Sequence, residues 1–404
     1  MKKQLFKSVS IVIVALISAL SMGCKTDIST DDYLRTVFNN LNQIQSATYF
    51  SRVQGFAPGD TSASTSGQYF VKEYNNPSDT TIGASFVKLR PKDLSKMSFC
   101  YDGNMRATAF EDGKYIVVDS FELNNLPFRP LTPPFFNYIK SILRYTLETK
   151  DSVTVTMKDY GDSVFCRIII FNNMQVEFFG KAFYCKDSYG FEEVISIYEI
   201  WINKSNNLPY RYRREMSHDI SEVNCKGLEI NKIDIKDFKA VDYFMPDYSI
   251  QMYNKGVNRS PGKDLTGQVA PDWVLKDVNN QEVSLDKLKS KVVMIQFTSV
   301  SCGPCRASIP FLKQLVKEFD IKDFDFVAIE GFNRNTNVLS GYQRRNDFNY
   351  RFLASTEAVT KAYQIKAVPV FYILDENRTI RKVIRGYGKD ITDKEIRDAI
   401  NELI

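Results

Sequence analysis

The sequence predicts two folded parts of different classes. One is an N-terminal α+β part, built on a curved antiparallel sheet with helices on one face, and the other is a C-terminal α/β part. Short runs of aromatic and β-branched residues follow one another after residue 47, whereas strand runs alternate with amphipathic helices after residue 265. Residues 253–268, rich in Gly, Ser, Asn and Pro, separate the two patterns. We therefore expect domains at 31–252 and 265–404, joined by a linker at 253–264.

The first 23 residues have the features of a secretory signal peptide. Three lysines precede an apolar stretch, residues 11–20, that is too short to span a bilayer comfortably. The sequence SMGC that follows resembles a bacterial lipobox, whose cysteine becomes the lipidated first residue, although Leu is more usual at Ser21 and a small residue at Met22. We expect residues 1–23 to be removed, Cys24 to be lipidated and residues 24–30 to form a tether. A signal peptide cleaved elsewhere, or a transmembrane anchor, are the alternatives.

Charge and composition exclude several classes of protein. The chain is 44% hydrophobic and 25% charged, which is ordinary for a globular protein and argues against disorder. Its formal charge falls from +5 to +2 when the three lysines of the signal peptide are removed. Without a basic run interleaved with aromatic residues, we expect no nucleic-acid partner.

An amphipathic helix opens the N-terminal part. Thr30 is a suitable N-cap, and Asp31 and Asp32 place negative charge in the first turn, where the helix dipole favours it. The apolar side chains recur at helical spacing and are Leu34, Val37, Phe38, Leu41 and Ile44.

Short strands dominate the sequence after this helix. The pair Asp112-Gly113 is typical of a tight hairpin turn. Residues 133–148 predict a second helix, started by proline, and more strand runs follow from residue 152 to residue 241. Because strands prevail and hairpins connect them, we expect an antiparallel, strongly curved sheet with the helices on one face.

This part of the chain resembles the LolA/RseB-like fold of periplasmic lipoprotein-carrier and sensor proteins. The resemblance covers roughly residues 30–250 and rests on the early helix, on YDGNMRATAFEDGKYIVVD and on EIWINKSNNLPYRYRRE, where a strand with Trp201 leads through a turn to Leu208-Pro209. It implies a domain that holds an apolar ligand or a partner. A spacer that docks partners is the alternative.

The remaining cysteines fit an exported protein. Besides Cys24 and the pair described below, the chain has four cysteines, Cys100, Cys166, Cys185 and Cys225. Disulfides are permitted outside the cytoplasm, and four cysteines allow three pairings among which the sequence does not choose. Four buried thiols are the alternative, and the strand parity of Cys166 predicts that it is buried in either case.

The C-terminal part alternates strands and helices. The sequence predicts strands at 291–297 and 324–332, helices at 305–319, 356–365 and 394–403, and a hairpin that turns at Asp375 to Arg378. This order is typical of an α/β fold with a mixed sheet.

Cys302 and Cys305, with Gly303 and Pro304 between them, lie where a strand ends and a helix begins. A helix N-terminus offers free N–H groups and partial positive charge, which stabilise a thiolate, the nucleophile of disulfide exchange. Cys305 lies one turn later and can resolve a mixed disulfide. Pro304 suits a first helical turn, because its missing N–H costs nothing there. The pair is therefore a candidate redox dithiol.

The alternatives to a redox dithiol are a zinc site and an accidental pair. A zinc site needs more ligands, but the chain has no second Cys-x-x-Cys and its only histidine, His218, lies in the other domain. We therefore expect no metal and no cofactor. An accidental pair is disfavoured by Pro369, which precedes a strand and fits a cis peptide bond facing the helix start. An ordinary proline at the start of a strand remains the alternative for Pro369.

Residues 265–404 resemble the TlpA/ResA-like family of thioredoxin-fold disulfide reductases. The matching segments are LTGQVAPDWVLKDVNNQEVSLDKLKSKVVMIQF, SCGPCRASIPFL, AVPVFYILDENRTI and GYG. The family implies a thioredoxin fold and a membrane-tethered extracytoplasmic enzyme. It further implies that Cys302 attacks, that Cys305 resolves, and that Val368 and Pro369, with Gly303 and Pro304, shape the substrate groove.

Three positions depart from the family's pattern. Ser301 replaces the usual aromatic residue, Gln296 stands where thioredoxins place a buried acid, and Ser308 stands where several reductases carry a glutamate. The resemblance therefore does not identify the residue that would act as acid or base for the dithiol. Glu330, at the end of the second strand on the same sheet edge, is a candidate proton acceptor, although we slightly prefer a solvated loop carboxylate.

Together these features predict a lipid-anchored thiol–disulfide oxidoreductase of a bacterial cell envelope. We expect it on the periplasmic side, at the outer rather than the inner membrane, held through the lipid on Cys24. Its expected partners are disulfide-containing envelope proteins and a thiol protein that donates or accepts electrons. The alternative is a lipid- or partner-binding lipoprotein in which the thioredoxin-like domain is accessory. The direction of electron flow stays open, because it depends on a reduction potential.

Overall fold

A computed structural model describes residues 29–56, 58, 61–111, 113–122, 131–171, 174–185, 195–217, 219–253 and 264–404. The predicted signal peptide, Cys24, most of the tether and most of the linker lie outside the described residues, as does His218. In the ranges that the structure describes, no helix is both long enough and apolar enough to cross a membrane.

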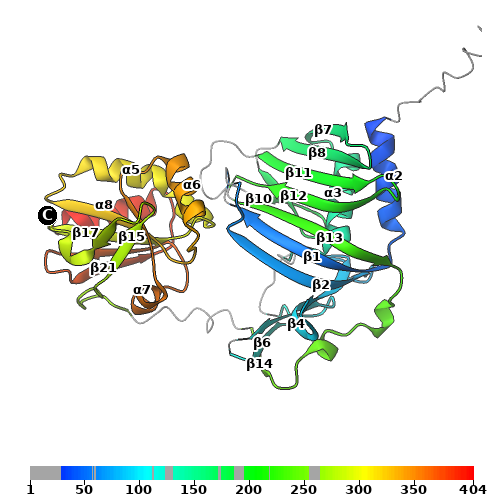
Figure 1. The fold of residues 1–404 in the computed structure, drawn as a ribbon, viewed down its shortest axis with the longest axis horizontal. Helices are drawn as coiled ribbons and strands as arrows, with labels where there is room; N and C mark the ends of the chain where they lie inside the picture. The colour runs from blue at the N-terminus through cyan, green and yellow to red at the C-terminus, as the bar shows by residue number, and fades with distance from the viewer. Residues whose placement is uncertain are drawn as a thin grey trace, which may run out of the picture.

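A twelve-stranded sheet dominates the described residues of the N-terminal part (Figure 1). Its strand order is β14-β6-β5-β4-β3-β2-β1-β13-β12-β11-β8-β7. The strands are β1 (Ser46–Phe56), β2 (Thr65–Asn75), β3 (Ala84–Arg90), β4 (Asp93–Tyr101), β5 (Arg106–Phe110), β6 (Tyr115–Asp119), β7 (Ser152–Asp159), β8 (Ser163–Phe171), β11 (Ile195–Asn203), β12 (Leu208–Glu215), β13 (Ile220–Ile230) and β14 (Ser249–Met252). Neighbouring strands are antiparallel except β14, which pairs in parallel with β6.

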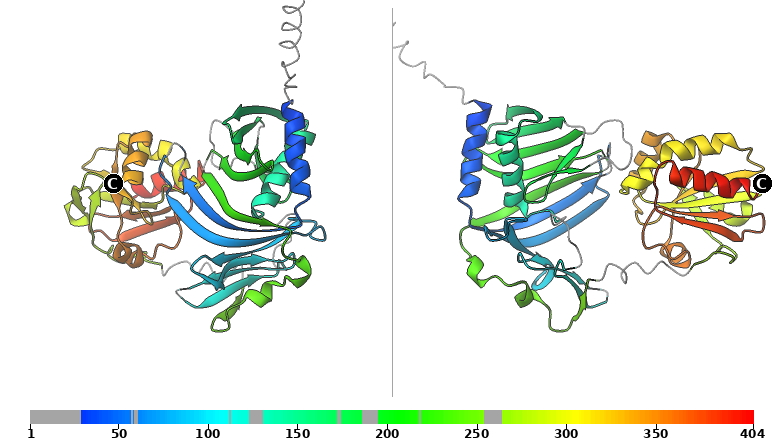
Figure 2. Two further views of the ribbon diagram at one scale, coloured as in Figure 1. Left: turned by 45° about the vertical axis from the view of Figure 1, so that its right-hand side comes forward. Right: turned by 180° about the vertical axis from the view of Figure 1, so that it is seen from behind.

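Two helices, α2 (Thr30–Asn42) and α3 (Phe135–Glu148), cover one face of this sheet, which curves around them (Figure 2). They share one hydrophobic core with the sheet, to which α2 contributes Leu34, Val37 and Leu41. The cap of α2 is Ser29 and not Thr30, as the sequence had suggested. The Ser29 hydroxyl accepts a hydrogen bond from the backbone N–H of Asp32 at 3.1 Å, so the helix begins one residue earlier.

Smaller elements complete this part. A two-stranded ribbon of β9 (Gln175–Phe178) and β10 (Ala182–Cys185) lies outside the main sheet order. The short 3-10 helices η1 (Ile235–Asp237) and η2 (Ala240–Tyr243) lead to β14. Their segment packs against β3 to β6 in a second hydrophobic core.

The four described cysteines of the N-terminal part are free thiols. Cys100 and Cys166 are buried, and Cys185 and Cys225 are partly buried. The expected burial of Cys166 is confirmed, because alternate residues of β8 are buried. Of the two alternatives in the sequence, the structure contains free thiols rather than disulfides.

A seven-stranded mixed sheet forms the C-terminal part, in the order β16-β15-β19-β18-β17-β20-β21. Its strands are β15 (Val274–Asp277), β16 (Glu282–Ser284), β17 (Val292–Thr298), β18 (Phe324–Glu330), β19 (Arg351–Ala354), β20 (Val370–Leu374) and β21 (Ile380–Arg385). The central strands β17, β18 and β19 are parallel, and β20 runs antiparallel to β17. Every residue of β17 and β18 is buried, as expected for strands covered on both faces.

Helices lie on both sides of this sheet. They are α4 (Gly303–Ala307), α5 (Ile309–Glu318), α6 (Thr336–Asn346), α7 (Glu357–Ala362) and α8 (Ile391–Asn401), and the 3-10 turn η3 (Leu285–Lys287) precedes β17. Helices α5, α6 and α8 share one core with the sheet, and α7 belongs to the core of the other face.

Several details of the C-terminal part differ from the sequence prediction. The short strands β15, β16 and β19 were not predicted, and the helix expected at 305–319 is divided at Ser308 into α4 and α5. Helix α6 was not predicted either, because it is polar over most of its length and buries only Val338, Leu339, Gly341 and Tyr342. Helix α8 begins at Ile391 rather than Lys394, since Gly388 and Thr392 exchange two hydrogen bonds that set the helix start.

Candidate active site

The two cysteines at the C-terminal end of β17 are joined by a disulfide. Cys302 is the N-cap of α4, and its Sγ accepts a hydrogen bond from the backbone N–H of Cys305 at 3.1 Å. The Cα atoms of the two residues lie 5.2 Å apart. Pro304 occupies the first turn, where its missing N–H leaves no helical hydrogen bond unmade. The strand end and the helix start thus place both sulfur atoms at one edge of the sheet.

The two sulfur atoms differ in access. Cys302 is partly exposed, whereas Cys305 is 1% exposed. A partner could therefore reach Cys302 first, while Cys305 is sheltered behind it. Gly303 is buried and Pro304 is partly buried beside them.

The segment before β20 faces the disulfide. The peptide bond between Val368 and Pro369 is cis, as the sequence suggested. The Sγ atom of Cys302 lies 3.6 Å from the carbonyl oxygen of Val368. Although 66 residues separate them in the chain, the structure brings this carbonyl against the more accessible sulfur.

Gln296 and Ser308, two positions that depart from the family pattern, contact each other. The Gln296 side-chain amide donates a hydrogen bond to the Ser308 hydroxyl at 3.1 Å, and that hydroxyl donates to the carbonyl of Cys305 at 2.7 Å. Both side chains are buried. A neutral hydrogen-bonded pair therefore connects β17 to the helix that carries Cys305.

Glu330 is not the solvated loop carboxylate that we slightly preferred, because it is 0% exposed at the end of β18. One carboxylate oxygen accepts a hydrogen bond from the Val300 N–H at 2.7 Å, and the other accepts from Phe332 and Asn333 at 2.9 Å each. Burial raises the pKa of the Glu330 carboxyl, and these backbone hydrogen bonds oppose the rise. Glu330 thereby ties the loop that leads to Cys302 to the loop after β18.

Ser301 is exposed, and its hydroxyl lies 3.2 Å from that of Ser299. No aromatic ring covers Cys302 from position 301.

Sequence reasoning missed two sets of contacts at this site. One joins Gln296, Ser308 and Cys305, and the other joins Glu330 to the loop that leads to Cys302. Gln296 lies 12 residues from Ser308 and Glu330 lies 30 residues from Val300, and no local sequence pattern indicates pairs at such distances along the chain.

In the described ranges, no group of three or more His, Cys, Asp or Glu side chains is placed so that it could hold a metal ion.

Known proteins match the C-terminal part of the chain. Residues 265–400 match the model of the Redoxin family. The thioredoxin-like protein YneN of Bacillus subtilis strain 168 is 29% identical over 140 residues, which is 33% of this chain and 78% of that protein. The thiol-disulfide oxidoreductase ResA of the same strain is 25% identical over 136 residues, 33% of this chain and 74% of that protein.

A solved structure similar to this chain is the putative thiol:disulfide interchange protein DsbE from Chlorobium tepidum. It is 22% identical, with a TM-score of 0.32, and the match covers 34% of this chain and 96% of that one. The family match and the curated relatives agree with the strand–dithiol–helix arrangement described above. The C-terminal part of the chain is therefore a redoxin domain with a thioredoxin-like fold, and the protein is a thiol–disulfide oxidoreductase.

Proposed function

We propose that the chain is a membrane-anchored thiol–disulfide oxidoreductase that reduces or exchanges disulfides of extracytoplasmic proteins through the Cys302-Gly303-Pro304-Cys305 dithiol. The observation that carries this proposal is the Cys302–Cys305 disulfide at a helix start, with the Val368 carbonyl 3.6 Å from the Cys302 sulfur.

In the reduced protein, the proposed cycle begins with the thiolate of Cys302. The N–H of Cys305 and the helix N-terminus stabilise that thiolate. It attacks one sulfur of a substrate disulfide, the substrate S–S bond breaks, and the second substrate sulfur leaves as a thiolate that takes up a proton. Cys305 then loses its proton and attacks the Cys302 sulfur of the mixed disulfide. The substrate leaves as a dithiol with two electrons, and the protein returns to the disulfide form described here.

The substrate groove is proposed to lie between the dithiol and the cis-proline segment. The carbonyl of Val368 faces Cys302, and Pro369 begins the turn into β20. With Gly303 and Pro304 on the opposite side, these residues would hold an extended substrate segment through its backbone. Ser301 leaves the side of the groove next to Cys302 without an aromatic wall.

Two single-cysteine variants test the function. Cys302→Ser should abolish reduction of a disulfide-bonded test protein such as insulin by dithiothreitol, and Cys305→Ser should instead accumulate mixed disulfides that are visible on non-reducing gels. Cys185→Ser, which removes a cysteine of the other domain, is the matched control and should leave the rate unchanged. Full exchange activity in Cys302→Ser would refute the proposal.

The direction of electron flow can be measured from the reduction potential of the dithiol. A value near ~−270 mV, as in thioredoxin, would assign a reductase, and a value near ~−120 mV, as in DsbA, an oxidant. An external thiol protein must restore the reduced or oxidised form after each cycle.

We also propose that Cys24 carries a lipid that holds the protein at the periplasmic side of a bacterial outer membrane. The support is the signal-like N-terminal sequence that ends in Gly23-Cys24. Cys24→Ser should move the protein from the membrane fraction to the soluble fraction of the envelope. Continued membrane association of that variant would contradict the lipid anchor.

The division into domains at 31–252 and 265–404, with a linker at 253–264, is part of the same proposal. It is supported by the two separate sheets and by hydrophobic cores that do not cross between them. The LolA/RseB-like nature of the first domain is proposed on its long curved sheet with two helices on one face.

A further inference from the structure

A cavity of about 450 Å³ lies on the helix-covered face of the N-terminal sheet, beside the start of α3. This volume is within the range of sites that bind small organic molecules. Most of its walls are aromatic or aliphatic side chains, among them Tyr49, Val71, Phe135, Tyr138, Tyr212 and Val223. The cavity would therefore favour a ligand with a mostly apolar body.

Three of the charged residues that line this cavity are paired with one another. Arg214 forms ion pairs with Glu177 and, at 2.9 Å, with Asp219. The hydroxyl of Tyr138 also donates a hydrogen bond to Glu177 at 2.6 Å. These groups have internal partners and do not require a ligand.

Lys88, on β3, is the remaining charged residue of the lining, and its surroundings are different. Its cross-strand neighbours are Val71 and Phe99. The ammonium nitrogen lies 5.7 Å from the ring centroids of Tyr69 and Phe86 and 5.9 Å from that of Phe99. Among the residues that the structure describes, Lys88 forms no ion pair and no side-chain hydrogen bond, and its side chain is partly exposed.

This environment is costly for a cation. Desolvation lowers the pKa of Lys88, and no opposing negative charge contributes. Aromatic faces attract the ammonium group but do not neutralise it. Lys88 is more enclosed than an exposed surface lysine, and charges held largely away from water are normally paired in proteins, so an anion in the cavity would supply the partner that Lys88 lacks among the described residues.

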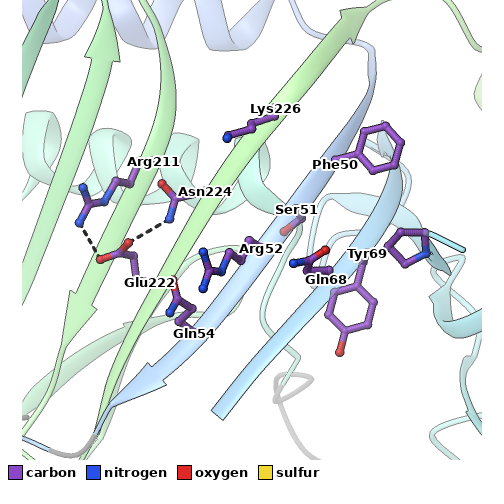
Figure 3. Close-up of a pocket in the computed structure, with 11 residues that line it drawn as sticks. Phe50, Ser51, Arg52, Gln54, Gln68, Tyr69, Arg211, Glu222, Asn224 and Lys226 are labelled. Atoms are coloured by element: carbon purple, nitrogen blue, oxygen red, sulfur yellow. Dashed lines mark hydrogen bonds and ion pairs between the residues drawn. The ribbon is translucent and has the colours of Figure 1, made fainter. Parts of the chain in front are cut away.

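The hollow on the opposite face of the same sheet shows a different arrangement (Figure 3). There Glu222 accepts hydrogen bonds from Arg211 at 2.8 Å and from Asn224 at 2.9 Å. The other two cations of that hollow, Arg52 and Lys226, are exposed. Water can solvate them, so they need no ligand even though neither has an acidic partner among the described residues.

We propose that the helix-side cavity binds an amphiphilic monoanion, a carboxylate with an apolar body, whose charged head pairs with Lys88. One ammonium group matches one negative charge, and Glu177 and Asp219, which line the same cavity, would disfavour a dianion. The apolar body would lie along the aromatic and aliphatic walls. This binding activity goes beyond disulfide exchange and does not depend on Cys302.

Calorimetric titration of the full mature protein with decanoate tests the proposal, with 1-decanol as the neutral analogue and decyl phosphate as the dianionic one. Decanoate should bind most tightly. Lys88→Met should weaken decanoate binding about 10- to 100-fold, as expected when a hydrogen bond to a charged group is lost, and should leave decanol binding unchanged. Lys88→Arg should restore most of the decanoate affinity. Lys226→Met, which removes a lysine from the hollow of Figure 3, is the matched control and should bind like the wild type.

Lys88→Met should fold, because it replaces an unpaired charge with an apolar chain of similar length, and circular dichroism checks this. Three results would overturn the proposal: no decanoate binding to the wild type, equal decanoate affinity in folded Lys88→Met, or equal wild-type affinity for decanoate and decanol. Tighter binding of decyl phosphate would overturn the assignment of a monoanion. Cys302→Ser should bind decanoate like the wild type, so the ligand site and the dithiol can fail independently.

Discussion

Cys100 and Cys166 are chemically unlike the pair at Cys302 and Cys305. Burial raises the pKa of the Cys100 thiol and that of the Cys166 thiol to about 12 each. The thiolate is the reactive form, so both cysteines should be inert near neutral pH. Burial alone thus distinguishes these two thiols from the pair that we propose to be redox-active, although all four residues are cysteines.

That difference predicts a labelling pattern. After mild reduction, iodoacetamide at pH 8 should modify Cys302 quickly and leave Cys100 and Cys166 unmodified until the protein is unfolded. Peptide mass spectrometry with and without urea measures this. Equal labelling of Cys166 and Cys302 in the folded protein would show that the Cys166 thiol is not sheltered.

Glu330 is expected to act mainly as an anchor of the loop that carries Cys302. Glu330→Gln leaves one of three backbone N–H groups without an acceptor, which should lower the free energy of unfolding by about 1–3 kcal/mol. The pKa of Glu330 is raised in the folded state. Its contribution to the free energy of unfolding is therefore complete at a pH below the pKa of the unfolded state, and it is lost as the pH rises through the pKa of the folded state. The decrease in unfolding free energy caused by Glu330→Gln should therefore be larger at pH 4 than at pH 8.

Urea unfolding at both pH values measures this effect, with Glu376→Gln, an exposed glutamate in the β20–β21 turn, as the control. A pH-independent loss would mean that the ionisation of Glu330 is not coupled to folding. A variant that keeps full stability but loses disulfide exchange would instead indicate a direct acid/base role for Glu330.

Ser308 is predicted to stabilise the start of the helix after the dithiol. Ser308→Ala removes the acceptor of the buried Gln296 amide, and an unsatisfied buried donor costs about 1–3 kcal/mol. The double variant Gln296→Leu, Ser308→Ala should recover much of the loss, because neither polar group then remains unpaired. Denaturant unfolding of the single and double variants tests this coupling, which purely additive effects would contradict.

At the scale of elements, the start of α2 depends on one side chain. Ser29→Ala removes the hydroxyl that accepts from the Asp32 N–H and should destabilise the N-terminal part by about 1 kcal/mol. Ser29→Thr should retain most of the stability, because a threonine hydroxyl can also cap the helix and can keep the hydrogen bond that Ser29 donates to Asp32. Thr30→Ala, one residue inside the helix, is the control and should have little effect in thermal unfolding. If Thr30→Ala destabilised the protein more than Ser29→Ala, Thr30 rather than Ser29 would be the cap.

At the scale of the whole molecule, the two sheets have separate interiors. The two clusters of the C-terminal part contain only residues from 265 onward, and those of the N-terminal part contain none of these residues. Residues 264–404 expressed alone should therefore fold cooperatively and retain the dithiol exchange activity of the full chain. Calorimetry and the insulin assay measure both properties. An unfolded or inactive fragment would show that the redoxin domain needs the N-terminal part.

The sequence by itself determined the features that depend on local pattern. The end of a buried strand followed by Cys-Gly-Pro-Cys places Cys302 at a helix start, because strand and helix periodicities and the proline position are encoded within a few residues. The same applies to the cis Val368–Pro369 bond, the buried Cys166 and the change of pattern near residue 260. Where the local signal is weak, as in the polar helix α6, prediction from the sequence failed.

Only the tertiary structure decided which distant side chains meet. It joined Gln296 to Ser308, buried Glu330 beneath the loop that leads to Cys302 and placed Lys88 at a cavity without an ionic partner among the described residues. These properties depend on how elements pack and on which groups packing removes from water. Neither packing nor desolvation is a property of one segment, so spacing along the chain carries no signal for them. The proposed chemistry of the dithiol could thus be inferred from a short segment, whereas its surroundings and the proposed ligand cavity depended on the packing of the whole fold.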